Sequence, residues 1–189
     1  MVEVINGQNI LDTEAEYIVC LTTKDENSNT QLDMFEDKYP HIWKEYSKFL
    51  KHWKKSKSSE SNLYLNNIQF VPIDSWALVM CDTYKNEQIV PYDKKYQYVC
   101  NIPNGLCKDE RGKLVLDINV FERHLIKIHD IAKGNGGSVA IKWINEFSNP
   151  TIYHIIEKVF SDNVRCLLYK WWIIFNYWVQ GKLCDPPII

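Results

Sequence analysis

The sequence has no C-x-x-C pair, although it contains six cysteines among 189 residues. That absence argues against a zinc ribbon and against a thioredoxin-type redox motif, so no metal site is predicted. Cys107 and Cys184 lie in polar or proline-rich surroundings, and we expect them to be exposed. The other four lie inside apolar runs and are predicted to be reduced core thiols: Cys20, Cys81, Cys100 and Cys166.

Strong charge of one sign and long hydrophobic runs are also missing. The formal net charge is −2, which predicts no strong attraction to nucleic acid or to an anionic membrane. The opening stretch MVEVINGQNIL lacks the basic start and apolar run of a secretory signal. The aromatic run near the C-terminus is too short and interrupted to cross a bilayer. We therefore expect a cytoplasmic protein without a membrane partner.

The pattern that is present predicts an α/β fold. Hydrophobic residues make up 46% of the chain, enough for a packed core, and its length suits one domain. Apolar runs such as EYIVCLTT, KYQYVCNIP, SVAIKWI and VRCLLYKW are predicted strands, and further strands are expected at VEVI, LYLNNIQFVPI and SWALVMCDTY. The second half of the chain reads strand–helix–strand–helix–strand, which is typical of a sheet covered by helices.

Three helices are predicted from apolar spacing and capping residues. The helix predicted over residues 39–57 has one apolar face, and lysines cover much of the rest. The residues of the apolar face are Ile42, Trp43, Tyr46, Phe49, Leu50 and Trp53. The second helix begins after Asp117 as N-cap and is expected to end at Gly134. The third has Asn149 as N-cap and Pro150 in its first turn. Residues 24–33 and 104–113 are predicted to be polar loops.

The C-terminal tail, residues 171–189, is unusually aromatic. Two interpretations stay open: the tail packs on the domain as a buried element, or it forms a patch for a protein partner. Large aromatic side chains are typical anchors of protein interfaces. The candidate partner-binding residues are Trp171, Trp172, Phe175 and Trp178.

The order of these elements resembles the macrodomain family, which binds ADP-ribose. It is most similar to the branch of bacterial DNA ADP-ribosylation antitoxins. Tyr39-Pro40 matches the aromatic-proline helix start of that branch, and Asn101-Ile102-Pro103 stands at its Asn-aromatic-Pro step. The resemblance covers most of residues 2–170. It implies a single three-layer domain over residues 1–170, with a mixed, mostly parallel sheet of about six strands and helices on both faces.

The resemblance also implies where a ligand would bind. Gln8 and Asn9 stand in the family's first turn, near the adenine. Thr22 and Thr23 fall where the family has an Asn-x-x-Asn pattern near the distal ribose, and both asparagines are absent. The remaining candidate ligand-binding residues lie in the NIPNG step and in the second phosphate loop: Asn101, Asn104, Asn145, Ser148 and Asn149.

Glycine is missing where the family uses it most. The chain has seven glycines, and none lies in KDENSNTQLDMF or INEFSNP, the counterparts of the two glycine-rich phosphate loops. Glycine matters there because it adopts positive φ and lets backbone amides approach phosphates. Acidic residues in both segments (Asp25, Glu26, Asp33 and Glu146) would also repel a diphosphate. The sequence therefore keeps the pattern of the fold while its diphosphate grip has been lost or rebuilt.

Three functions follow from this combination. The first is a non-catalytic macrodomain-like protein that binds ADP-ribose or a related nucleotide in a remodelled pocket. The alternative is an interaction or inhibitor protein without a small ligand; a composition rich in Asn, Lys and Ile would fit a virus or mobile element. A hydrolase using the Thr22 or Thr23 hydroxyl and Asp25 is a third interpretation. No cofactor and no catalytic residue are predicted.

Overall fold

A computed structural model describes residues 1–23, 31–55, 68–74, 97–103, 105–144, 147 and 150–170 of the 189-residue chain. The strand predicted at residues 75–84 and the aromatic tail at residues 171–189 lie outside the described residues, as do Cys81 and Cys184.

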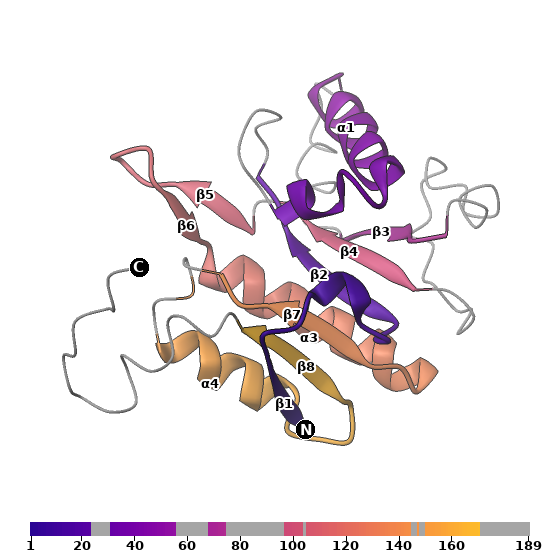
Figure 1. Cartoon of the computed structure of the whole chain (residues 1–189). Coiled ribbons are helices and arrows are strands. Elements are labelled where there is room, and N and C mark those ends of the chain that lie inside the picture. Colours follow the sequence, from indigo (N-terminus) through magenta and orange to yellow (C-terminus); the bar gives the residue numbers. More distant parts are fainter. Residues whose placement is uncertain are drawn as a thin grey trace, which may run out of the picture.

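A six-stranded sheet forms the centre of the domain, as Figure 1 shows. Its strand order is β1-β8-β7-β2-β4-β3, and every pair is parallel except β3 with β4. The strands span Val2–Asn6 (β1), Tyr17–Leu21 (β2), Gln69–Pro72 (β3), Tyr98–Ile102 (β4), Val139–Lys142 (β7) and Cys166–Lys170 (β8). The predicted fold class, with six strands in a mixed and mostly parallel sheet, is confirmed.

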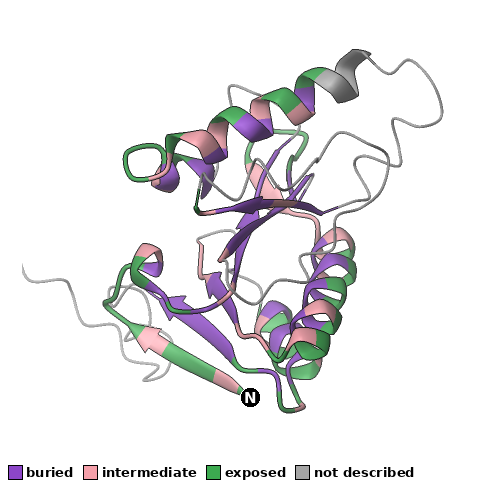
Figure 2. Cartoon of the chain, turned by 90° about the vertical axis from the view of Figure 1, so that its right-hand side faces the viewer, coloured by how far each residue is buried: buried purple, intermediate pink, exposed green. Residues whose placement is uncertain are grey.

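Helices cover both faces of this sheet. Helix α1 (Pro40–Lys55) lies on one face, with the short 3-10 helices η1 (Ile10–Asp12) and η2 (Gln31–Phe35). Helices α3 (Ile118–Asn135) and α4 (Pro150–Val159) lie on the other face. Figure 2 shows the buried strands between α1 and α3. Strands buried on both faces need apolar side chains at every position, and all five residues of β2 are buried.

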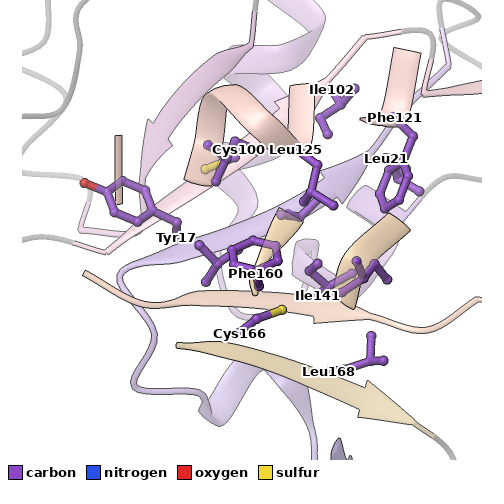
Figure 3. Packing of buried hydrophobic residues seen from close by; sticks show 14 of the residues in the cluster. Tyr17, Leu21, Cys100, Ile102, Phe121, Leu125, Ile141, Phe160, Cys166 and Leu168 are labelled. Atoms are coloured by element: carbon purple, nitrogen blue, oxygen red, sulfur yellow. The ribbon is translucent and has the colours of Figure 1, made fainter. Parts of the chain in front are cut away.

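Successive β2 residues supply two separate cores. Ile18 and Cys20 pack toward α1, whereas Tyr17, Val19 and Leu21 pack toward α3 and α4. On the second side, Figure 3 shows Phe121, Leu125 and Phe160 packed over the strands, and Phe121 and Leu125 are fully buried.

Capping residues set the ends of α3. The Asp117 side chain accepts a hydrogen bond of 3.0 Å from the Val120 N–H, as the N-cap prediction requires. The prediction that Gly134 ends the helix is wrong by two residues. Gly136 is the C-cap, because its φ of 62° turns the chain into the left-handed region, and Gly134 lies in the last turn.

Two segments predicted as polar loops contain regular structure. Residues 104–113 include strand β5 (Leu106–Lys108), which pairs with β6 (Leu114–Leu116) as a hairpin. The Asp109 carboxylate organises the turn by accepting hydrogen bonds from the Arg111 and Lys113 N–H groups. In the segment 24–33, the residues from Gln31 onward belong to η2, which buries Gln31, Leu32 and Phe35. Residues 24–30 lie outside the described part.

An ionic cluster joins the α4–β8 loop to α3. One Asp162 oxygen accepts from His129 Nε2 at 2.9 Å, and the other lies 2.9 Å from Lys133 Nζ. The first oxygen also accepts from the Val164 N–H at 3.1 Å. The hydrogen bond from His129, followed by those from Lys133 and Val164, holds the pKa of the Asp162 carboxyl well below its ordinary value.

Truncation of the α3 core residue Leu125 should destabilise the domain strongly. Leu125→Ala leaves a cavity under α3, so the free energy of unfolding should fall by about 2–5 kcal/mol. Its neighbour Ile126 is 44% exposed and serves as the control. Ile126→Ala should change that free energy by less than about 1 kcal/mol in urea titrations. Equal losses in the two variants would contradict the assigned face of α3.

Acid should selectively remove the contribution of Asp162. A carboxyl whose pKa is depressed in the folded state adds stability above its unfolded pKa, about 3.9, and loses it as pH falls toward the folded value. Wild type should therefore exceed Asp162→Asn in unfolding free energy at pH 7, and the gap should shrink below about pH 4. Urea titrations between pH 7 and pH 2 measure this gap. Asp37→Asn, at an exposed carboxylate, is the control. A gap that is independent of pH would refute the assignment.

Candidate functional site

The path of the chain marks the edge of the sheet at the carboxyl ends of β2 and β7 as the candidate site. Strands β2 and β7 are parallel neighbours, but the chain leaves β2 toward α1 and leaves β7 toward α4, on opposite faces (Figure 1). Such a reversal is a topological switch point, and ligands of open α/β sheets bind there, beyond the carboxyl ends of the strands. The site is therefore sought around the ends of β2, β4 and β7.

The two strands separate at this point. Pairing of β2 with β4 continues to Leu21 and Ile102, whereas pairing of β2 with β7 ends at Val19 and Ile141. Beyond its end, β7 stays with β8, because the Trp143 N–H donates to the Tyr169 carbonyl at 2.8 Å. The backbone groups facing the separation therefore need other partners.

The side-chain amide of Gln31 supplies those partners. Its Oε1 accepts from the Leu21 N–H at 2.9 Å, and its Nε2 donates to the Lys142 carbonyl over a longer 3.4 Å. The residue comes from η2 and is buried. The Gln31 carboxamide thus makes the two hydrogen bonds that β2 and β7 would otherwise make with each other. Gln31 belongs to the segment where the family resemblance predicts a glycine-rich loop.

The candidate residues Thr22 and Thr23 are buried in structural contacts. The Thr22 hydroxyl donates to the Ile102 carbonyl at 3.0 Å, and the Thr22 carbonyl accepts from the Leu106 N–H at 3.2 Å. The Thr23 carbonyl accepts from the Tyr46 hydroxyl at 2.8 Å. These bonds join the end of β2 to β4, to the hairpin and to α1. Thr22 and Thr23 therefore have a structural role: their hydrogen bonds hold neighbouring elements together.

Asn101 holds the most unusual polar atom of the site. Its Nδ2 donates to Gln69 Oε1 at 3.0 Å, and Gln69 Nε2 donates to the Glu45 carbonyl at 3.2 Å. These two hydrogen bonds fix the orientations of the Asn101 and Gln69 amides, since each amide nitrogen faces an acceptor. Asn101 Oδ1 is left buried with no hydrogen-bond partner in the described part of the chain. A buried acceptor without a donor is costly and points to a missing partner.

The first-turn candidates lie after β1, at the edge of the sheet. The Asn9 side chain accepts from the Leu11 N–H at 3.1 Å and caps η1, while Gln8 is exposed. Strand β8 separates β1 from β7, so these residues are not brought to the switch point by the sheet itself. η1 packs against β7, which leaves them near the rim of the site.

The segment after β7 is anchored by one aromatic residue. Phe147 is 1% exposed, and its ring centre lies 5.4 Å from that of Phe121 and 5.3 Å from that of Trp143. This packing joins the counterpart of the second phosphate loop to the core under α3. Four candidates lie outside the described residues: Asn104, Asn145, Ser148 and Asn149.

Two lysines that the sequence patterns did not predict as site residues lie at the same edge. Lys142 ends β7, and Lys170 ends β8. The buried Lys170 ammonium lies 4.3 Å from the Trp143 ring centre and 4.9 Å from that of Tyr153, and burial lowers its pKa. The available signal was a lysine closing an apolar strand, as in VAIK and LLYK, where a charge at a buried strand end demands a reason.

Thiol chemistry at the site is suppressed by burial. Burial raises the pKa of the Cys20 and Cys100 thiols, and that of Cys166 to about 12, so all three stay protonated near neutral pH. The predictions that these are core thiols and that Cys107 is exposed are confirmed. Within the described ranges, no group of three His, Cys, Asp or Glu side chains is arranged to hold a metal ion. None of the described helices is long and apolar enough to cross a membrane.

Solved structures of macrodomains share this architecture. The macrodomain of Thermus aquaticus DarG has a TM-score of 0.59 at 14% identity, and the match covers 90% of this chain and 98% of that one. The macrodomain of Mycobacterium tuberculosis DarG has a TM-score of 0.57 at 13% identity, with 88% and 97% covered. A macrodomain protein from Streptomyces coelicolor has a TM-score of 0.55 at 12% identity, with 90% and 99% covered.

No protein-family model and no curated protein sequence matches the chain. At 12–14% identity the structural likenesses concern the fold, and they extend over nearly the whole length of each macrodomain. They agree with the strand order and helix placement described above, and with the resemblance seen in the element order of the sequence. The chain therefore has the macrodomain fold.

Proposed function

We propose that this chain is a non-catalytic macrodomain-like protein that binds ADP-ribose or a related nucleotide at the carboxyl ends of β2, β4 and β7. The observation that carries the proposal is the switch point itself. The macrodomain-like topology brings together, at the β2–β7 separation, the strand ends that the family resemblance assigns to the ligand.

Polar groups near this edge support ligand binding. Gln31 bridges the separated strands, and Lys142 supplies a positive charge. Asn101 carries a buried acceptor that has no partner among the described residues. In this remodelled pocket, side chains replace the backbone amides of glycine-rich loops. Such side-chain contacts would compensate for the absence of glycine from both expected phosphate loops.

The same contacts argue against catalysis. The Thr22 hydroxyl donates to a backbone carbonyl, and the buried Cys20 thiol has a raised pKa, so neither is an activated nucleophile. A hydrolase would need a nucleophile or water held beside a base within hydrogen-bond reach. The described part of the edge offers no such pair.

A protein-interaction role is the second candidate. It is favoured by Phe147, which is packed into the core at the position where an open phosphate loop is expected. The candidate partner residues Trp171, Trp172, Phe175 and Trp178 would serve such a role. The polar groups around the switch point favour the nucleotide.

Addition of ADP-ribose should stabilise the folded chain. A ligand that binds only the native state adds about 2.7 kcal/mol at a concentration 100 times its Kd, which raises the melting temperature. Calorimetric titration should give a saturable signal. Hydrogen exchange should slow at residues 20–23, 101–103 and 142–144, and stay unchanged at residues 160–165 on the opposite edge. The absence of heat and of a thermal shift at millimolar ADP-ribose would reject this proposal and favour a protein partner.

The chain should not release ADP-ribose from a modified substrate. Incubation with an ADP-ribosylated oligonucleotide and with an ADP-ribosylated protein should leave both intact, as measured by mass spectrometry. A catalytically active macrodomain hydrolase serves as the positive control. Turnover by the wild-type chain that persists through repeated purification would refute the non-catalytic assignment.

A further inference from the structure

Lys142 lies where β2 and β7 separate. It is the last residue of β7, and its carbonyl accepts the hydrogen bond from Gln31. Side chains alternate along the strand, so Lys142 shares the α1 face with Ala140, whereas Ile141 points to the α3 face. The lysine therefore extends on the side covered by η2, within the first segment that lacks the expected glycines.

Lys142 is half-buried, and its ammonium lies beside a thioether. Its Nζ lies 3.8 Å from the Met34 thioether sulfur, which is a weak acceptor. No carboxylate lies within 4 Å of it in the described part of the chain, and Asp33 on η2 forms no ion pair with it. Burial raises the pKa of the Cys20 thiol, and both charges also act on it: the Lys142 charge lowers this pKa and the Asp33 charge raises it.

Four other lysines among the described residues have acidic partners. Ion pairs of 2.6–3.3 Å join Lys38 to Asp12, Lys48 to Glu45, Lys133 to Asp162 and Lys158 to Glu122, although these lysines are more exposed. Removing a cation from water without a counter-charge is costly. Lys142 is half-buried, lies at the edge where the fold places ligands, and has no carboxylate within 4 Å among the described residues. We therefore infer that an anion can be supplied from outside.

Lys170 is a different case. It projects on the opposite face, between the Trp143 and Tyr153 rings, and the negative faces of these rings balance its charge in place. The two lysines at neighbouring strand ends are therefore not equivalent. Lys142, with a thioether as its neighbour, is the one suited to an incoming phosphate.

We propose that Lys142 binds the phosphate group of the ligand, as a point charge that replaces the backbone amides of the missing glycine-rich loop. This inference rests on the proposed function and specifies how that site holds its ligand. Lysine serves as a phosphate ligand in other folds through its charge and does not need glycine-dependent backbone geometry. The Asp33 carboxylate on η2 repels the same anion and therefore lowers the affinity for it.

Three variants test this proposal. Lys142→Gln removes the charge, Lys142→Arg keeps it, and Lys44→Gln, at an exposed lysine on α1, is the matched control. Because Lys142→Gln removes a charge-assisted hydrogen bond to the phosphate, it should weaken ADP-ribose binding about tenfold or more. Lys142→Arg should keep most of the affinity, Lys44→Gln should match wild type, and Asp33→Asn should bind more tightly. Urea titrations verify that each variant is folded.

Inorganic pyrophosphate separates this inference from the proposed function. If wild type binds ADP-ribose and Lys142→Gln binds it equally well, the role of Lys142 is refuted while the function stands. A second outcome is that wild type does not bind ADP-ribose but is stabilised by pyrophosphate, whereas Lys142→Gln is not stabilised by pyrophosphate. That result would support the anion site and refute nucleotide binding. If neither compound binds wild type, both proposals fail. A melting temperature of Lys142→Gln above that of wild type without ligand would agree with relief of an uncompensated charge.

Discussion

The parallel pairing of β2 with both β4 and β7 is the constraint on which the rest of the structure depends. It buries β2 on both faces, so its five residues serve two cores at once. The chain leaves the neighbouring strands β2 and β7 toward opposite faces of the sheet. β2 and β7 separate there, and the proposed ligand would bind at that separation.

In the proposed site, side chains replace the backbone amides with which glycine-rich loops hold an anion. Glycine-rich loops present several amides with little side-chain bulk. Here the Gln31 carboxamide binds the free backbone groups, Phe147 anchors the second segment in the core, and Lys142 supplies charge. A scaffold of this kind keeps its fold with different contacts because the sheet and helices do not depend on the ligand loops.

Sequence patterns predicted the elements well where the signal was local. The Asp117 cap, the α1 stripe and the buried thiols at Cys20 and Cys100 were confirmed, because capping and apolar periodicity act over one or two turns. The hairpin formed by β5 and β6 was missed, since strands of three residues give too short a pattern. The end of α3 shifted to Gly136 because backbone geometry decides which of several nearby glycines caps a helix.

The sequence by itself determined an α/β domain with macrodomain-like order and without glycine in its two expected phosphate loops. Only the tertiary structure decided which polar groups meet. Thr22 and Thr23 form internal hydrogen bonds that join β2 to β4 and α1. Among the described residues, the Asn101 side-chain oxygen has no hydrogen-bond partner, and Lys142 reaches the switch point without a neighbouring carboxylate. The reason is that hydrogen bonds and charge balance join residues distant along the chain, and sequence spacing carries no record of those distances.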